Sequence, residues 1–484
     1  MPKRNLAWVV VIVMVAAGLW QLPKTAARLD SLDKTFGPMM AVRAKIAKHY
    51  VDSVDDEALV AGAIRGMLSE LDPYSNYISA KDYAAFQQAS DGEYGGVGIE
   101  LGRDPDGQFI VVSPIEDSPA FHAGVLAGDR ILAVDNEPLK SNTLIEDVVN
   151  LIMGEAGTTV TLTVQHPTQP RPREIPILRD RIALASVKGW YRQVDGAWDY
   201  FLDLESRIAY IRLTSFVEAS RGDLERAIAQ VREQRMAGLI LDLRNNGGGL
   251  LSSAVSIADL FLPEGTIVTT KRMDVQLNEW KATREGTLPA FPLVVLINRN
   301  SASASEIVAG ALRDHQRATI VGERSYGKGS VQNVYTMPED NTALKLTVAY
   351  YHLPNGECIH RTQASEKDAL HGAAQDPRRR RLSSTPSEKN ASWGVAPDVE
   401  VLMTDEELVA TYVTRREADV IRPPSTAPSD DDATTRPAPT TQVGSPPMDR
   451  QLAKAIEVLR EKLDLPTSEA APPPTPKPGE PVPG

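Results

Sequence analysis

A turn of small residues, Ser301-Ala302-Ser303-Ala304-Ser305-Glu306-Ile307, decides how this chain folds. It follows the apolar run 291–298, which is typical of a buried strand, and a helical pattern continues after it to Leu312. A turn between a buried strand and a helix brings a hydroxyl together with free backbone N–H groups at the positive end of the helix. That arrangement suits a serine nucleophile beside an oxyanion site, although serines at this position also serve as ordinary helix caps.

Strands alternate with helices upstream of this turn, which predicts an α/β core. The buried strand Leu239–Leu243 runs into Arg244-Asn245-Asn246-Gly247-Gly248-Gly249, and a helix is expected over 250–260. Three glycines between a strand and a helix let the backbone approach a ligand closely, or they form a plain turn. We expect the core to span residues 181–404.

A lysine between two glycines, Lys328, lies downstream in the segment Gly322-Glu323-Arg324-Ser325-Tyr326-Gly327-Lys328-Gly329. This spacing comes within one residue of a phosphate-binding loop, which makes a P-loop-like NTPase an alternative. Gly329, however, stands where the magnesium-binding Ser or Thr belongs, and residues 331–337 predict a strand in place of the phosphate-binding helix. A lysine serves as a general base only when it is neutral, which requires an apolar, dry site that lowers its pKa.

The composition indicates an enzyme-like, multidomain protein. Its 484 residues predict two or three domains. The net charge of −12 argues against nucleic acid as a partner. A single cysteine, Cys358, excludes an internal disulfide framework and a cysteine-rich metal site.

The N-terminus has the pattern of an export signal. Lys3 and Arg4 precede the uncharged apolar run Leu6–Trp20, and basic residues follow it. We expect residues 1–28 to form an uncleaved signal anchor, with a cleaved signal peptide as the alternative. Either form would export the bulk of the protein, and the anchor would fix it to the membrane, facing the periplasm or extracytoplasmic space.

Two further regions precede the core. Residues 36–90 are predicted to be helical, because apolar side chains recur there at helical spacing. Residues 91–180 alternate short strands with tight turns and resemble a PDZ domain. In this resemblance Gly96-Val97-Gly98-Ile99 occupies the carboxylate-binding loop, and residues 142–153 form the groove helix. PDZ domains add a peptide's C-terminal end as an extra strand, so the resemblance implies that this region binds chain termini.

Three stretches together resemble the carboxyl-terminal processing peptidases, also called tail-specific proteases: 241–250 (LDLRNNGGGL), 301–307 (SASASEI) and 326–332 (YGKGSVQ). The resemblance covers about Met39 to Val401. It implies a multidomain α+β protein in which a helical segment and a PDZ domain precede an α/β core of the ClpP/crotonase type. It also implies that Ser303 is the nucleophile, Lys328 the general base and Gln332 the residue that orients the lysine. In a strand, Lys328 and Gln332 would point to the same face.

The same resemblance implies an oxyanion hole formed by the N–H of Ala304 and by that of Gly248 or Gly249. The implied reaction is peptide-bond hydrolysis through an acyl-enzyme, with no cofactor and no metal. The implied substrates are proteins with accessible, apolar C-termini. An alternative from another class is a PDZ scaffold with an inactive catalytic domain, which binds C-termini without cutting them.

The sequence departs from the family pattern in two places. Gly247 stands where the family has a proline, which should loosen the glycine loop. Residues 361–392, with the basic run Arg378–Arg381, are predicted to be an insertion in the core. Residues 405–484 are predicted to form a disordered Pro-rich tail with one amphipathic helix at 449–463, whose apolar face suits docking on the body or on a second subunit of a homo-oligomer.

Overall fold

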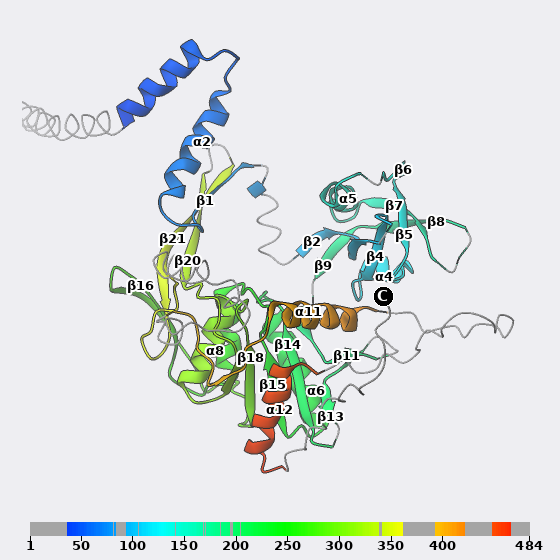
Figure 1. Ribbon diagram of the computed structural model, residues 1–484, viewed down its shortest axis with the longest axis vertical. Coiled ribbons are helices and arrows are strands. Elements are labelled where there is room, and N and C mark those ends of the chain that lie inside the picture. Colours follow the sequence, from blue (N-terminus) through cyan, green and yellow to red (C-terminus); the bar gives the residue numbers. More distant parts are fainter. Residues whose placement is uncertain are drawn as a thin grey trace, which may run out of the picture. The chain divides into compact units, whose positions relative to one another are not determined.

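A computed structural model of the chain describes residues 36–465 apart from 81, 84–92, 105, 141, 168, 170, 184, 194–196, 204, 338–340, 362–392 and 422–447 (Figure 1). The chain divides into two compact units, the first ending at Tyr77 and the second beginning at Ile78. The predicted anchor, nearly all of the predicted insertion and most of the predicted tail lie outside the described residues. Among the described helices, none has both the length and the apolar composition that crossing a membrane requires.

The first unit contains a helix over residues 36–49 and helix α2 (Asp56–Ser69), and strand β1 (Asn76–Ile78) follows. Asp55 caps α2, because its carboxylate accepts the N–H of Glu57 at 2.9 Å. Beyond α2, the Asp72 carboxylate accepts the N–H groups of Tyr74 and Ser75, each at 2.8 Å, in a local turn. This turn lies where the sequence predicts that the helical pattern ends.

The second unit begins with a small antiparallel sheet and two short helices. Its elements are β2 (Glu93–Gly96), β3 (Ile99–Arg103), β4 (Phe109–Pro114), α4 (Pro119–His122), β5 (Arg130–Val134), β6 (Glu137–Pro138), α5 (Ile145–Ile152), β7 (Thr159–Gln165), β8 (Arg173–Leu178) and β9 (Asp180–Ala183). The main strand order is β3-β4-β5-β7-β8, so β3 is an edge strand among the described residues. Every second residue of β7 is buried, as expected of a strand with one face on a core.

The α/β core follows. Its elements are β10 (Val187–Lys188), β11 (Tyr191–Arg192), β12 (Trp198–Asp199), β13 (Phe201–Asp203), β14 (Ile208–Leu213), α6 (Ser220–Glu233), β15 (Gly238–Asp242), α7 (Leu251–Asp259), β16 (Thr266–Arg272), β17 (Val275–Lys281), β18 (Leu293–Ile297), α8 (Ala304–Asp314), β19 (Thr319–Gly322), β20 (Ser330–Met337), β21 (Thr342–His352), β22 (Val399–Glu400), α11 (Asp405–Asp419) and α12 (Arg450–Lys462). Strands β14, β15, β18, β19 and β22 pair in parallel in that order. In a second sheet, β21 pairs with β20 and β16, and β16 pairs with β17.

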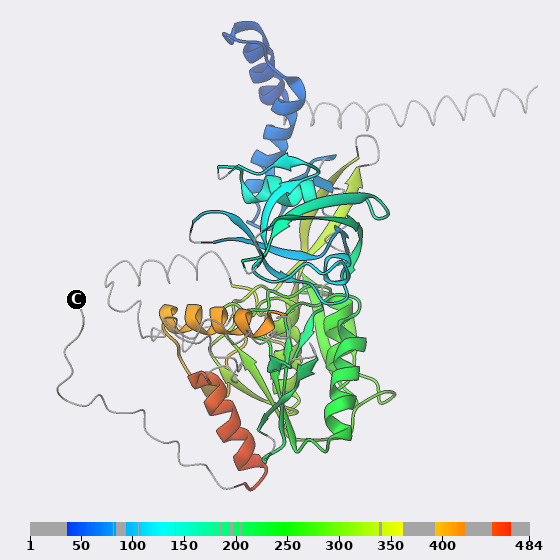
Figure 2. The same cartoon turned by 90° about the vertical axis from the view of Figure 1, so that its right-hand side faces the viewer.

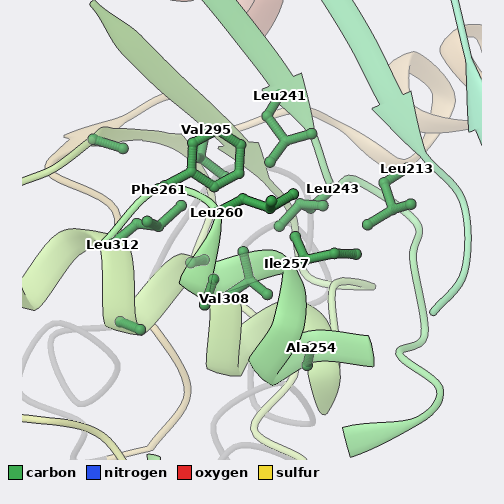
Figure 3. Close-up of a cluster of buried hydrophobic side chains, with 14 of the residues drawn as sticks. Leu213, Leu241, Leu243, Ala254, Ile257, Leu260, Phe261, Val295, Val308 and Leu312 are labelled. Atoms are coloured by element: carbon green, nitrogen blue, oxygen red, sulfur yellow. The ribbon is translucent and has the colours of Figure 1, made fainter. Parts of the chain in front are cut away.

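The central strands of the parallel sheet are buried on both faces, which explains their continuous apolar runs. Alternate residues meet different helices. One set, which includes Leu241 and Val295, packs with α7 and α8 (Figure 3). The other set, which includes Ile240 and Val294, packs with α12. Figure 2 shows α12 on one side of this sheet and α6 on the other, so the core has three layers.

The structure corrects the predicted tail at one point, because residues 405–419 form helix α11. Thr404 and Glu407 begin this helix with a capping box, in which each residue's backbone N–H donates to the other's side chain. Further along, α12 begins after its cap Asp449 and buries Leu452 and Leu459 against the core sheet. This helix therefore docks on the body of its own chain.

Candidate active site

Three loops that carry sequence motifs leave the same edge of the parallel sheet. Strands β15, β18 and β19 are neighbours and run in the same direction. The loops that follow them hold Gly248, Ser303 and Lys328, respectively. In open α/β sheets, ligands bind outside the carboxyl ends of the strands. The sheet topology therefore brings three motifs that are distant in sequence to one edge.

Ser303 lies at the sharp turn between β18 and α8. Its backbone has φ +57° and ψ −112°, a conformation that residues other than glycine rarely adopt. Of residues 301–312, only Ser303 is not buried. The neighbouring hydroxyls are engaged in the interior, since Ser301 donates to the carbonyl of Leu243 at 2.8 Å and Ser305 to that of Asn246 at 2.9 Å. Ser303 is thus the one serine of the turn that is only partly buried.

The glycine loop packs directly on this turn. The N–H of Ala302 donates to the carbonyl of Asn246 at 3.0 Å. Gly248 has φ +102°, and a Cβ atom there would lie 2.8 Å from the Cβ of Ser303 and 3.0 Å from the nitrogen of Ala304. Only glycine fits such a close approach. The N–H of Gly248 donates to Asn246 Oδ1 at 2.8 Å.

Lys328 lies just before β20 and not within a strand, because β20 begins at Ser330. Both flanking glycines are required by packing. A Cβ at Gly327 would lie 2.9 Å from the Trp393 ring, and one at Gly329 would lie 2.5 Å from the backbone nitrogen of His360. The Lys328 side chain is partly buried, and this burial lowers its pKa.

Glu306, in the first turn of α8, joins the serine turn to the lysine segment. Its carboxylate is fully buried. One oxygen accepts the N–H of Ser303 at 2.7 Å and the N–H of Lys328 at 2.9 Å. The other accepts the hydroxyl of Ser325 at 2.5 Å and the N–H of Gly327 at 2.7 Å. The sequence motif contained this glutamate, but sequence reasoning gave it no role.

Gln332 lies on β20 opposite Thr347 of β21. Its side-chain amide donates to the hydroxyl of Ser330 at 2.7 Å. An irregularity in the pairing falls between Val331 and Gln332. The orienting role of Gln332 toward Lys328 stays a prediction.

The predicted peptide-binding loop connects β2 to the edge strand β3. The carbonyl of Val97 accepts the N–H of Ala120 at 2.8 Å, and the carbonyl of Gly98 accepts that of Ile115 at 2.9 Å. Gly98 has φ +78°, and a Cβ there would lie 2.2 Å from the Ser118 side chain. The loop is therefore held in one shape by α4 and its N-cap, and α5 packs beside β3.

This arrangement defines a class, a serine peptidase core preceded by a PDZ domain. Comparison with family models agrees. Residues 207–369 match peptidase family S41, residues 110–166 match a PDZ domain, and residues 22–82 match the N-terminal domain of the activating protease CtpB.

Named relatives cover most of the chain. A carboxy-terminal-processing protease of Bartonella bacilliformis is 42% identical over 320 residues, which are 65% of this chain and 70% of that protein. The carboxy-terminal processing protease CtpB of Bacillus subtilis is 33% identical over 347 residues, 70% of this chain and 68% of that one. The solved structure of a photosystem II D1 C-terminal processing protease is 28% identical in sequence to this chain. The match covers 77% of this chain and 90% of that protein's chain, with a TM-score of 0.40. The chain belongs to the carboxy-terminal-processing serine proteases of peptidase family S41.

Proposed function

We propose that this protein cleaves peptide bonds with Ser303 as nucleophile and Lys328 as general base. One observation supports the pair above all. A single oxygen of Glu306 accepts the backbone N–H of both residues, so their nitrogens lie no farther apart than two hydrogen bonds of 2.7 and 2.9 Å laid end to end. The one serine of the turn that is only partly buried therefore lies beside the segment that carries the lysine.

The electrostatics of the lysine suit a base. Burial lowers the pKa of Lys328, and the positive charge of Lys345 lowers it further. Neutral Lys328 takes the Ser303 proton while the serine oxygen bonds to the carbonyl carbon of the substrate. The protonated lysine then gives that proton to the leaving amine, and water hydrolyses the acyl-enzyme. Gln332 orients the lysine in this proposal.

The oxyanion formed in both steps would be held by the N–H of Ala304, at the start of α8, and by a glycine N–H. Gly248 is the nearer glycine, because its α-carbon packs on Ser303. Its N–H donates to Asn246 Oδ1, so it must turn from that partner when it serves an oxyanion. Gly249 is the alternative donor in the same loop.

The substrate class follows from the first domain of the second unit. We assign residues 91–180 to it and 181–404 to the catalytic core. Edge strand β3 can accept a peptide as an additional strand, and the loop 96–99 lies where the peptide's terminal carboxylate would end. Proteins with apolar C-termini are therefore the proposed substrates. The apolar run Leu6–Trp20 supports export and anchoring to the membrane by residues 1–28, with the catalytic core in the periplasm or extracytoplasmic space.

The test uses the full chain and two variants, Ser303→Ala and Lys328→Ala. Mass spectrometry of a protein with an apolar C-terminus should show fragments with the wild type and none with either variant, while circular dichroism shows that both variants fold. Cleavage by Lys328→Ala at the wild-type rate would refute the pair. A substrate whose C-terminus is amidated should be cut more slowly than the free acid, and equal rates would refute recognition of the carboxylate.

A further inference from the structure

A glutamate in the first turn of a helix ordinarily completes a capping box, in which it accepts the N–H of the N-cap residue. Glu306 makes that bond to Ser303. Capping leaves its other three bonds unexplained, because the groups that donate them belong to Ser325, Gly327 and Lys328, on a segment that follows another strand. A carboxylate that only capped α8 would not need to be buried between two loops.

We propose that Glu306 is a positioning residue whose ionised carboxylate holds Ser303 and Lys328 at reacting distance. This inference rests on the proposed function of that pair. Glu306 would touch neither substrate nor the reacting atoms, and it acts through the backbone of both partners. Each partner's N–H donates to the same oxygen, so a displacement of this oxygen changes the separation of nucleophile and base.

The ionised form is required because all four donors need lone pairs. A carboxylate offers about four acceptor positions on its two oxygens, and here each oxygen accepts two hydrogen bonds. An amide in its place has one acceptor oxygen, and its NH₂ group would face two donors. Glu306→Gln therefore keeps nearly the same size, but at two of the four contacts it places a donor where the carboxylate accepts.

The charge of Glu306 also acts on the base. Burial raises the pKa of Glu306 to about 7, against the four hydrogen bonds that favour the charged form. Its negative charge in turn raises the pKa of Lys328, against burial and the charge of Lys345. Removal of the charge should therefore make the lysine easier to deprotonate.

Other charged or titratable side chains occur on the segments around this carboxylate. The guanidinium groups of Arg324 and Arg361 lie over the ring of Trp393, and the ring of His360 lies against Tyr350. Among the described groups, Lys345 and Glu306 are those whose charges shift the pKa of Lys328.

The test measures how fast a fluorophosphonate labels Ser303 in the full-length protein as a function of pH. Glu306→Gln should label about 100-fold more slowly at its plateau, because a displacement of about 1 Å between reacting groups costs about that factor. The acidic limb of its pH profile of labelling should also move to lower pH. The variant has no Glu306 to ionise, and its Lys328 loses a proton more easily because the negative neighbour is gone. The proposal would be overturned if the acidic limb of Glu306→Gln stayed at the wild-type pH and the labelling rate fell only in proportion to the amount of folded protein.

Two further variants keep the result decisive. Glu323→Gln changes another buried glutamate, which binds Arg299 and the N–H of Met403, and it should leave labelling per folded molecule and the acidic limb unchanged. If Glu306→Gln does not fold, Glu306→Asp should keep the wild-type limb, because it keeps the charge, with a lower plateau, because it is one methylene shorter. A moved limb in Glu306→Asp would count against the proposal.

Lys328→Ala separates this inference from the proposed function. If Lys328→Ala labels as fast as the wild type, the catalytic pair itself is wrong. If Lys328→Ala abolishes labelling but Glu306→Gln leaves the pH profile in place, only the positioning role is wrong.

Discussion

Ser303 differs from its neighbours in backbone conformation and in exposure. A non-glycine residue in a sparsely populated region of φ/ψ space costs on the order of 1–3 kcal/mol, which the surrounding contacts must offset. Here the N–H of Ser303 bonds to Glu306, and its carbonyl accepts the N–H of Ile307 at 3.0 Å. The turn therefore leaves Ser303 only partly buried while it keeps Ser301 and Ser305 in the interior.

The positive charge of Lys345 lowers the pKa of Lys328. Lys345→Met should raise the pKa of Lys328, because a positive neighbour that disfavours the ammonium form is removed. The proposed mechanism needs the neutral amine, so the acidic limb of peptide hydrolysis should move to higher pH. A pH–rate profile across the neutral and alkaline range measures this shift. Lys281→Met, at an exposed lysine of β17, is the control and should leave the limb in place; an unmoved limb in Lys345→Met would contradict the prediction.

Among the elements, the loop between β15 and α7 combines a permissive glycine with a restricted one. A Cβ at Gly247 would meet no atom within 4 Å, and its φ lies outside the left-handed region. The adjacent Gly248 is left-handed and packs on Ser303. Flexibility at Gly247 is thus not required by the fold, whereas the glycine at 248 is.

This contrast predicts opposite effects of the same substitution at adjacent positions. Gly247→Ala should raise the free energy of unfolding by about 0.4–1 kcal/mol, because it reduces the entropy of the unfolded chain, and should keep activity. Gly248→Ala should lower the free energy of unfolding and reduce peptide hydrolysis by about 100-fold, because it displaces Ser303. Urea unfolding and hydrolysis rates measure both. Equal effects at the two positions would refute this account of the loop.

Elements that bury a continuous apolar run could be predicted from sequence. The strands near 239–243 and 291–298 and the helix after Ser303 are confirmed within a few residues. Helix α11 was missed because it buries only Arg415 and Ala418, so it has no apolar periodicity to detect. Its remaining signal was the capping box at Thr404, which is short and common.

Of the candidate site, only the sequence motifs could be predicted, and not their arrangement in space. Ser303 and Lys328 could be singled out as residue types in suggestive contexts, but their proximity depends on the parallel order of β15, β18 and β19. Glu306 could not be assigned, because its role depends on burial between two loops that no local pattern encodes. A glutamate at this position of a helix ordinarily reads as a surface cap.

For the whole molecule, Glu306 couples stability to pH. Its pKa is about 7 in the folded protein, above its ordinary value of 4.5. Between these two pH values the folded state therefore binds one more proton than the unfolded chain. The stability that this group contributes is fully present below about 4.5 and is lost as the pH rises through about 7.

The corresponding prediction compares the wild type with Glu306→Gln. As the pH rises from about 4.5 to about 7, the free energy of unfolding of the wild type should fall relative to that of the variant, whatever the offset between them. Urea unfolding at several pH values measures this difference. A difference that is constant across the range would show that Glu306 does not titrate there.

Helix α12 has a consequence for biosynthesis. Ile208 and Ile240 are synthesised long before Leu452, which belongs to the same buried cluster in the finished protein. Until then the part of this apolar face that α12 covers is exposed, which favours aggregation or capture by chaperones. A chain released by a premature stop ahead of residue 450 would retain every proposed catalytic group. It would nevertheless lack α12, so we expect it to aggregate or to be captured by chaperones.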